Sequence, residues 1–150
     1  MVLTEKETSL LKDMKSQEEL CIKKYTKYAS EAKCEKLKEL FNSIANKERE
    51  HLKTIVEISE GKEPKAPSGV CATNDLCIAC SYQNTEDKDS DCFLLSDMLT
   101  TEKQVSSLYN TSVFEFTQPP LRKMLSHIQS EEQQHGEWLY AFMKANGMYN

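Results

Sequence analysis

Glycine and proline, the residues that most often interrupt helices, are scarce in this sequence. Its 150 residues include four glycines and four prolines, most of them at 61–69 and 117–120 or near the C-terminal end. Because neither residue fits well inside a helix, long helices are expected between these places. A chain of this length usually forms one compact domain, so residues 1–150 are expected to be a single domain.

The sequence also lacks a long hydrophobic run and a basic patch. No stretch approaches the ~20 apolar residues of a membrane-spanning helix, and residues 1–15 are polar, without the apolar segment of a signal peptide. The formal charge of −5 arises from interspersed acidic and basic residues. We therefore expect no nucleic-acid partner, no membrane partner and a cytoplasmic protein. Metals, small molecules and proteins remain as partners, and a homo-oligomer is left open.

The cysteines do not follow the spacing of a common metal site. Four of them, Cys71, Cys77, Cys80 and Cys92, form a series with a single Cys-x-x-Cys. A four-thiolate zinc or iron site, disulfide cross-linking and free thiols all remain open for these four. A reducing cell interior favours free thiols or metal ligands for the six cysteines of the chain. Cys21 is expected to be a small core residue.

Hydrophobic residues recur with helical periodicity in four segments. They predict helices over 5–32, 35–60, 90–116 and 119–146. Thr4 and Glu7 form a capping-box pattern at the first start, and Gly61 follows the second helix. Residues 61–89, which include the acidic run 86–89, show no sustained periodicity and are expected to form a long crossover. The predicted fold is all-α, an antiparallel four-helix bundle of two helical hairpins joined by this crossover.

Two copies of the pattern Glu-x-x-His occur within the predicted helices, at Glu48–His51 and Glu132–His135. Residues spaced i, i+3 project from one face of a helix, so each copy directs a carboxylate and an imidazole to one place. The two copies are 84 residues apart, and the same shift aligns the hydrophobic positions around them. It also pairs two carboxylates and two tyrosines that lie on the apolar faces of the other helices: Glu18 with Glu102, and Tyr25 with Tyr109.

The repeat also chooses between neighbouring carboxylates. It selects Glu18 over Glu19 and Glu132 over Glu131, in agreement with the hydrophobic periodicity. Glu19, Glu50 and Glu131 are therefore expected to be solvated. His127, which lies off this face, is expected to form a surface pair with Glu131 at i+4.

The polar residues on the apolar faces predict a dinuclear metal site. Four converging carboxylates would repel each other in an apolar core unless they were neutralised, and two divalent cations cancel their charge. One Glu from each of two helices and a Glu-x-x-His from each of the other two is the ligand set of di-iron bundles. Carboxylate-rich ligation favours two iron ions, with manganese as the alternative. The predicted ligands are Glu18, Glu48, His51, Glu102, Glu132 and His135.

Roles follow from this arrangement. Glu18 and Glu102 would be terminal ligands, whereas Glu48 and Glu132 would bridge the two metals. Tyr25 and Tyr109 lie two turns beyond the single carboxylates on the same faces. They are candidates for hydrogen bonds to the ligands, although aromatic side chains that only fill the core would have the same spacing.

The two halves of the sequence resemble two known families. Residues 18–32 and 45–51 resemble the first half of rubrerythrin-type proteins of the ferritin-like di-iron superfamily. Residues 96–103, 107–111, 120–122 and 131–135 resemble the spore coat F family. One departure from rubrerythrins is that Leu99 and Val105 lie one turn from Glu102, where rubrerythrins carry an additional carboxylate. Another is that the chain lacks their rubredoxin-like pair of Cys-x-x-Cys motifs.

These resemblances imply two alternative functions. Rubrerythrin-like proteins imply reduction of oxygen or peroxide at a di-iron centre, and the coat family implies deposition around bacterial endospores. The first hypothesis is a di-iron or di-manganese protein of the spore coat that reacts with oxygen or peroxide, as an oxidase or peroxide reductase. The alternative is a structural coat protein whose metal site is stabilising or vestigial. Other spore coat proteins are the implied partners under both, and disulfide cross-linking would then belong to the matured coat.

Overall fold

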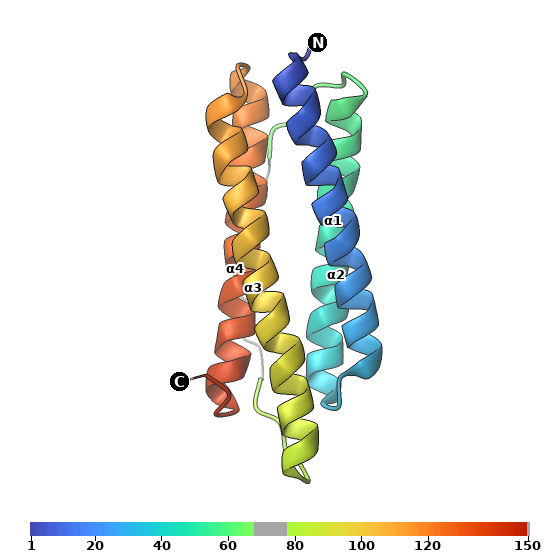
Figure 1. Ribbon diagram of the computed structural model, residues 1–150, viewed down its shortest axis with the longest axis vertical. Helices are drawn as coiled ribbons and strands as arrows, with labels where there is room; N and C mark the ends of the chain where they lie inside the picture. The colour runs from blue at the N-terminus through green and yellow to red at the C-terminus, as the bar shows by residue number, and fades with distance from the viewer. Residues whose placement is uncertain (68–77, 150) are drawn as a thin grey trace.

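Four long α-helices form the structure, a computed structural model that describes residues 1–67 and 78–149. They lie side by side as an elongated bundle (Figure 1), and the described residues contain no β-strand. The first two helices and the last two each form an antiparallel hairpin with a short turn. The second helix ends at the end of the bundle opposite to that at which the third begins. The predicted all-α four-helix bundle is confirmed, and its helices are α1 (Glu5–Glu31), α2 (Glu35–Ser59), α3 (Thr85–Glu115) and α4 (Pro119–Ala145).

The helix ends follow the local sequence. The Thr4 side chain accepts a hydrogen bond from the Glu7 backbone, and the Glu7 carboxylate accepts one from the Thr4 backbone, which completes the predicted capping box. Gly61 and Gly147 have φ angles of 82° and 66°, a left-handed conformation that glycine adopts without steric cost after a helix. Each helix ends one residue before its predicted end.

The start of α3 differs from the prediction. The helix begins at Thr85 rather than at residue 90, so the acidic run 86–89 belongs to its first turns and not to the crossover. The Asn84 side chain caps this end by accepting a hydrogen bond from the Asp87 backbone. Acidic residues interact favourably with the N-terminal end of a helix. The missing hydrophobic periodicity therefore indicated an exposed first turn rather than a loop.

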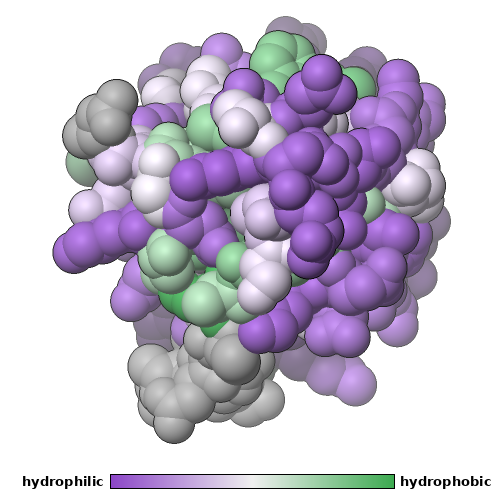
Figure 2. Space-filling model, turned by 90° about the horizontal axis from the view of Figure 1, so that it is seen from below, coloured by the Kyte–Doolittle hydropathy of each residue, from purple (hydrophilic) through white to green (hydrophobic). Residues whose placement is uncertain are grey.

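Hydrophobic side chains fill the space between the helices along the bundle. Both hairpins contribute to this core, and Phe41 and Leu95 are fully buried members of it. Cys21 is buried as a free thiol, as expected of a small core residue. No helix of the described residues has the length and hydrophobicity needed to cross a membrane. The end of the bundle that carries the α1–α2 turn is mostly hydrophilic, with a hydrophobic area below the centre of the view and a few scattered hydrophobic side chains (Figure 2).

Two buried carboxylates, 84 residues apart, connect the hairpins at opposite ends of the bundle. Glu7 on α1 accepts a hydrogen bond of 2.8 Å from the backbone N–H of Thr117, in the α3–α4 turn. Asp91 on α3 accepts hydrogen bonds from the backbone N–H groups of Lys33 and Cys34, in the α1–α2 turn, at 2.8 and 3.0 Å. Each hairpin thus supplies a hydrogen-bond acceptor for backbone N–H groups in the turn of the other hairpin. The 84-residue repeat therefore also relates Glu7 to Asp91.

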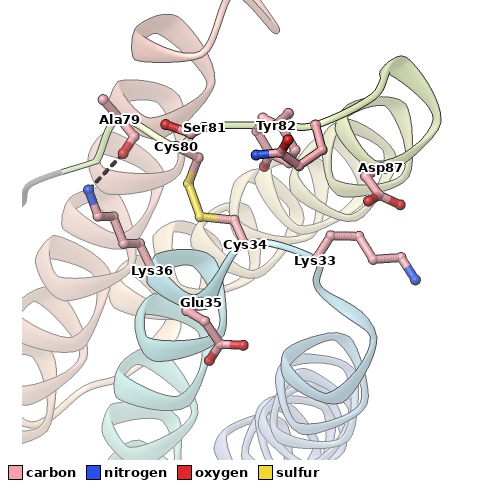
Figure 3. A pocket seen from close by; sticks show the side chains of 10 residues that line it. Lys33, Cys34, Glu35, Lys36, Ala79, Cys80, Ser81, Tyr82 and Asp87 are labelled. Atoms are coloured by element: carbon pink, nitrogen blue, oxygen red, sulfur yellow. Dashed lines mark hydrogen bonds between the residues drawn. A yellow bond between two sulfur atoms is a disulfide. The ribbon is translucent and has the colours of Figure 1, made fainter.

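A disulfide bond joins Cys34, at the start of α2, to Cys80, in the segment before α3 (Figure 3). The same segment is held by a hydrogen bond from the Cys80 backbone N–H to the Asn146 side chain, and by one from Lys36 Nζ to the carbonyl of Ala79. The expectation of free or metal-bound thiols is therefore wrong for Cys34 and Cys80.

The four-thiolate zinc or iron site suggested for the crossover is also wrong, because one of its four thiols is used in this disulfide. Cys92 has a free thiol that is half-buried. The other two cysteines of that proposed cluster, Cys71 and Cys77, lie outside the described residues.

Candidate metal centre

The structure brings all six predicted ligands into one buried layer near the middle of the helices. None is more than 3% exposed. The two Glu-x-x-His copies place their side chains on the inner faces of α2 and α4, as the i, i+3 spacing requires. The two single carboxylates come from α1 and α3. The layer consists of Glu18 (α1), Glu48 and His51 (α2), Glu102 (α3), and Glu132 and His135 (α4).

The layer divides into two overlapping clusters, each with four side chains whose nearest ligand atoms lie within 4.8 Å of one another. Glu48 and Glu132 belong to both clusters. The first cluster also contains Glu18 and His51, and the second contains Glu102 and His135. Each cluster has three carboxylates and one imidazole, and the two clusters share two carboxylates. This arrangement matches the ligand set expected of a dinuclear site.

Both histidines direct the same ring nitrogen, Nδ1, toward the carboxylates. His51 Nδ1 lies 3.0 Å from Glu48 Oε2 and 3.0 Å from Glu132 Oε1. His135 Nδ1 lies 3.2 Å from Glu48 Oε1 and 3.4 Å from Glu102 Oε1. The two rings are stacked with their centroids 6.0 Å apart. Each imidazole therefore offers Nδ1 as the atom that would complete one cluster.

Tyr25 and Tyr109 form hydrogen bonds across the bundle to the single carboxylates. The Tyr25 hydroxyl on α1 donates to Glu102 Oε1 on α3, and the Tyr109 hydroxyl on α3 donates to Glu18 Oε1 on α1, both at 2.5 Å. Each tyrosine thus orients the carboxylate contributed by the other hairpin. Both tyrosines are fully buried, so they fill the core and hold a candidate ligand at the same time.

Hydrogen bonding within the layer is incomplete. Among the described residues, the buried side-chain oxygen and nitrogen atoms without a hydrogen-bond partner are Glu18 Oε2, Glu102 Oε2 and Glu132 Oε2. Leaving such atoms unpaired in a protein interior is costly. Their concentration at one place, beside two imidazole nitrogens, fits a pair of metal ions that accept oxygen and nitrogen ligands.

Burial and mutual repulsion control the protonation of the layer. Burial, together with the charges of Glu48 and Glu132, raises the pKa of Glu18 and of Glu102 well above the usual range. Burial acts in the same direction on Glu48, but hydrogen bonds from His135 and His51 outweigh it and lower the pKa of Glu48. Without metal, protons must offset part of the negative charge.

The structure corrects the prediction for Glu131, which was expected to be solvated. Its side chain is only 11% exposed, and Glu131 Oε2 lies 2.9 Å from His51 Nε2. The predicted pair with His127 is present. Burial would raise the pKa of Glu131, but the hydrogen bond from His51 and the charges of Lys47 and His127 lower it to about 2. Glu131 is therefore a carboxylate that connects a half-buried histidine to a candidate ligand.

Comparison with known proteins separates the two halves of the chain. Residues 10–70 match the model of the Rubrerythrin family, and residues 90–150 match that of the Coat F domain. The resemblances inferred from the sequence are thereby confirmed. Among curated proteins and among solved structures, no match to this chain is found. The two matched segments, together with the buried clusters of carboxylates and histidines, indicate a ferritin-like metal-binding bundle associated with the spore coat.

Proposed function

We propose that this chain is a ferritin-like protein of the spore coat that binds two iron ions, with manganese as the alternative, and reacts with oxygen or peroxide. The proposal rests above all on the two buried clusters that share Glu48 and Glu132. A single buried carboxylate or histidine is often only a hydrogen-bonded core residue. Six of them in one layer, three with an unpartnered oxygen, form a cluster whose negative charge two divalent cations would neutralise.

The proposed ligand roles follow from cluster membership. Glu48 and Glu132 would bridge, because each belongs to both clusters, whereas Glu18 and Glu102 belong to one cluster each and would be terminal. One imidazole completes each position through Nδ1. Three carboxylates, which are hard ligands, and one imidazole for each ion suit iron or manganese, whereas structural zinc favours thiolate-rich sites.

The chain contributes orientation, charge balance and exclusion of water. Two ferrous ions bound here would each supply one electron, and with two protons these would reduce one hydrogen peroxide molecule to two water molecules. Tyr25 and Tyr109 hold the terminal carboxylates in place. The hydrophobic residues above and below the layer keep bulk water away from it.

Metal analysis with ferrous loading tests this function. The protein should bind about two metal ions per chain under anaerobic conditions, and the bound ferrous ions should be oxidised when oxygen or peroxide is added. The variant His51→Ala/His135→Ala should lose this binding while keeping its helical content by circular dichroism. Unchanged stoichiometry in that variant would rule out the site.

A structural coat protein is the second candidate. It is supported by the match of residues 90–150 to the Coat F domain and by the disulfide that fixes the segment before α3 to the first hairpin. Under this alternative the ions stabilise the bundle and other coat proteins are its partners. Ferrous ions that bind but are oxidised no faster than in buffer would favour it over the first proposal.

A further inference from the structure

The two candidate metal positions are related by the 84-residue repeat, but their surroundings are not equivalent. Four carboxylates of the described residues lie within 4.0 Å of a His51 ring nitrogen, and Glu131 is the one of these that lies outside the predicted ligand set. The carboxylates within that distance of His135 are all predicted ligands: Glu48, Glu102 and Glu132. One histidine therefore has an additional carboxylate, and its counterpart among the described residues does not.

The sequence explains this difference. The repeat places Glu131 opposite Lys47, since the two positions differ by 84. An ammonium group has hydrogen-bond donors but no acceptor, so Lys47 cannot accept a hydrogen bond from an imidazole N–H. Its Nζ instead lies 2.6 Å from Glu50 Oε2 and 3.8 Å from Glu131 Oε2. The second hairpin thus carries a carboxylate at a position where the first carries a cation.

Glu131 acts on the side of the His51 ring that faces away from the ligands. Nε2 of His51 lies 2.9 Å from Glu131 Oε2, whereas Nδ1 faces Glu48 and Glu132. A neutral imidazole has one N–H and one lone pair. When Nε2 donates to Glu131, the lone pair is on Nδ1 and points at the first cluster. A carboxylate partner of this kind fixes the ring and makes it a stronger metal ligand.

The position of Glu131 is itself fixed by further contacts. His127, one turn earlier on α4, contacts its Oε1 through Nε2, and Lys47 on α2 approaches its Oε2. Glu131 is therefore held between the two helices that carry the Glu-x-x-His copies.

From this asymmetry we propose that Glu131 is a positioning residue that makes the two metal positions unequal. The position completed by His51 binds its ion first and more tightly than the position completed by His135. This inference rests on the proposed metal-binding function. Loss of such a carboxylate partner typically weakens metal binding by about 10-fold to 100-fold, and an effect of that size is expected at one position only.

Anaerobic titration with Co²⁺ alone, followed by calorimetry and by visible absorption, tests the proposal. His135→Ala keeps the position with His51, and His51→Ala keeps the position with His135. The His135→Ala variant should bind Co²⁺ more tightly than the His51→Ala variant. Adding Glu131→Gln should weaken binding about 10-fold in the His135→Ala background and leave it unchanged in the His51→Ala background, because Glu131 acts through His51.

Two further variants separate this role from a general effect of charge or folding. Glu19→Gln removes an exposed carboxylate that pairs with Lys15 and should leave both affinities unchanged. In the exchange variant Lys47→Glu/Glu131→Lys, the position with His135 should bind Co²⁺ more tightly than the position with His51. Circular dichroism should show unchanged helical content in all variants that are compared.

The outcomes distinguish this inference from the proposed function. A wild-type protein that binds no Co²⁺ overturns both. Only the inference about Glu131 is overturned if the wild-type protein binds two ions but Glu131→Gln weakens Co²⁺ binding equally in the two single-histidine variants, or in neither of them.

Discussion

At the scale of single residues, the face of the helix decides what a carboxylate does. Glu18 is fully buried in the ligand layer, whereas the side chain of its neighbour Glu19 is 47% exposed. The two differ by a rotation of about 100° around the helix axis. The hydrophobic periodicity and the repeat both placed Glu18 on the buried face, because both depend on this rotation.

Substituting Glu18 or Glu102 by Gln tests the ligand layer at this scale. An amide has nearly the volume of a carboxylate and removes one like charge from a buried cluster. The metal-free thermal midpoint should therefore stay level or rise in both variants. Metal affinity should fall at least about 10-fold at the position that loses its carboxylate, which is the position with His51 for Glu18→Gln and the position with His135 for Glu102→Gln. Calorimetric titration and thermal unfolding measure the two effects.

Glu19→Gln is the control for this experiment. Its side chain is exposed and pairs with Lys15, so neither metal affinity nor stability should change appreciably. If Glu19→Gln weakens metal binding and Glu18→Gln does not, the assignment of the α1 carboxylate to the site is wrong.

The burial of Glu131 depends on a neighbouring helix and could not be predicted from the periodicity of α4 alone. Its neighbour Glu132 lies on the apolar face of α4, and periodicity therefore assigned Glu131 to solvent. In the structure α2 lies beside α4 there, and His51 extends across to reach Glu131. Periodicity gives the direction of a side chain from its own helix axis but not the position of the neighbouring helix. The pair of His127 with Glu131 could be predicted because both residues lie on α4.

At the scale of helices and turns, most boundaries could be predicted and the start of α3 could not. Hydrophobic periodicity reveals a helix only where it packs against the core. The first turns of α3 are stabilised instead by the Asn84 cap and by acidic residues, whose effect does not depend on periodicity. The contacts of Glu7 and Asp91 with the opposite turns join positions far apart in the sequence, which no local pattern encodes.

Glu7 leads to a prediction about pH at this scale. Burial would raise its pKa, but hydrogen bonds from the backbone of Thr117 and Thr4 outweigh burial and lower it. A carboxylate whose pKa is lower in the folded state stabilises the protein above its unfolded pKa, about 4.3. This contribution is lost as the pH falls through the lower folded pKa. Glu7→Gln should therefore reduce the free energy of unfolding by about 1–2 kcal/mol at pH 7.

Denaturant unfolding at several pH values measures the effect. The difference in free energy of unfolding between wild type and Glu7→Gln should be largest near neutral pH and should shrink below about pH 4. Glu5→Gln, in the same first turn but exposed, should cost less than about 0.5 kcal/mol at pH 7. A difference that stays constant down to pH 2 would contradict the role given to the Glu7 carboxylate.

At the scale of the whole molecule, two kinds of restraint hold the bundle together at different levels. The ligand layer joins all four helices near their middle, and the disulfide joins the start of α2 to the segment before α3. Cys34 precedes Glu48 by 14 residues, a separation of roughly 21 Å along a helix. Restraints this far apart, with no shared side chains, should contribute independently to stability.

Metal removal tests that independence. Ions that bind the folded cluster far better than the unfolded chain stabilise the fold by about 2.7 kcal/mol when free metal is 100 times the dissociation constant. At roughly 2–4 °C per kcal/mol for a chain of this size, Co²⁺ should raise the thermal midpoint by roughly 5–10 °C, and a chelator should reverse the shift. The variant His51→Ala/His135→Ala should show no shift.

The disulfide variant completes this experiment. Cys34 and Cys80 are separated by 46 residues, and closing a loop of that length stabilises a fold by about 2–4 kcal/mol. Cys34→Ser/Cys80→Ser should therefore have a lower midpoint than wild type both with and without Co²⁺. The shift produced by Co²⁺ should nevertheless be the same in the two proteins, because the disulfide lies several turns from the ligands. A Co²⁺ shift that disappears in this variant would mean that the end of the bundle and the ligand layer form one cooperative unit, and that the two restraints are not independent.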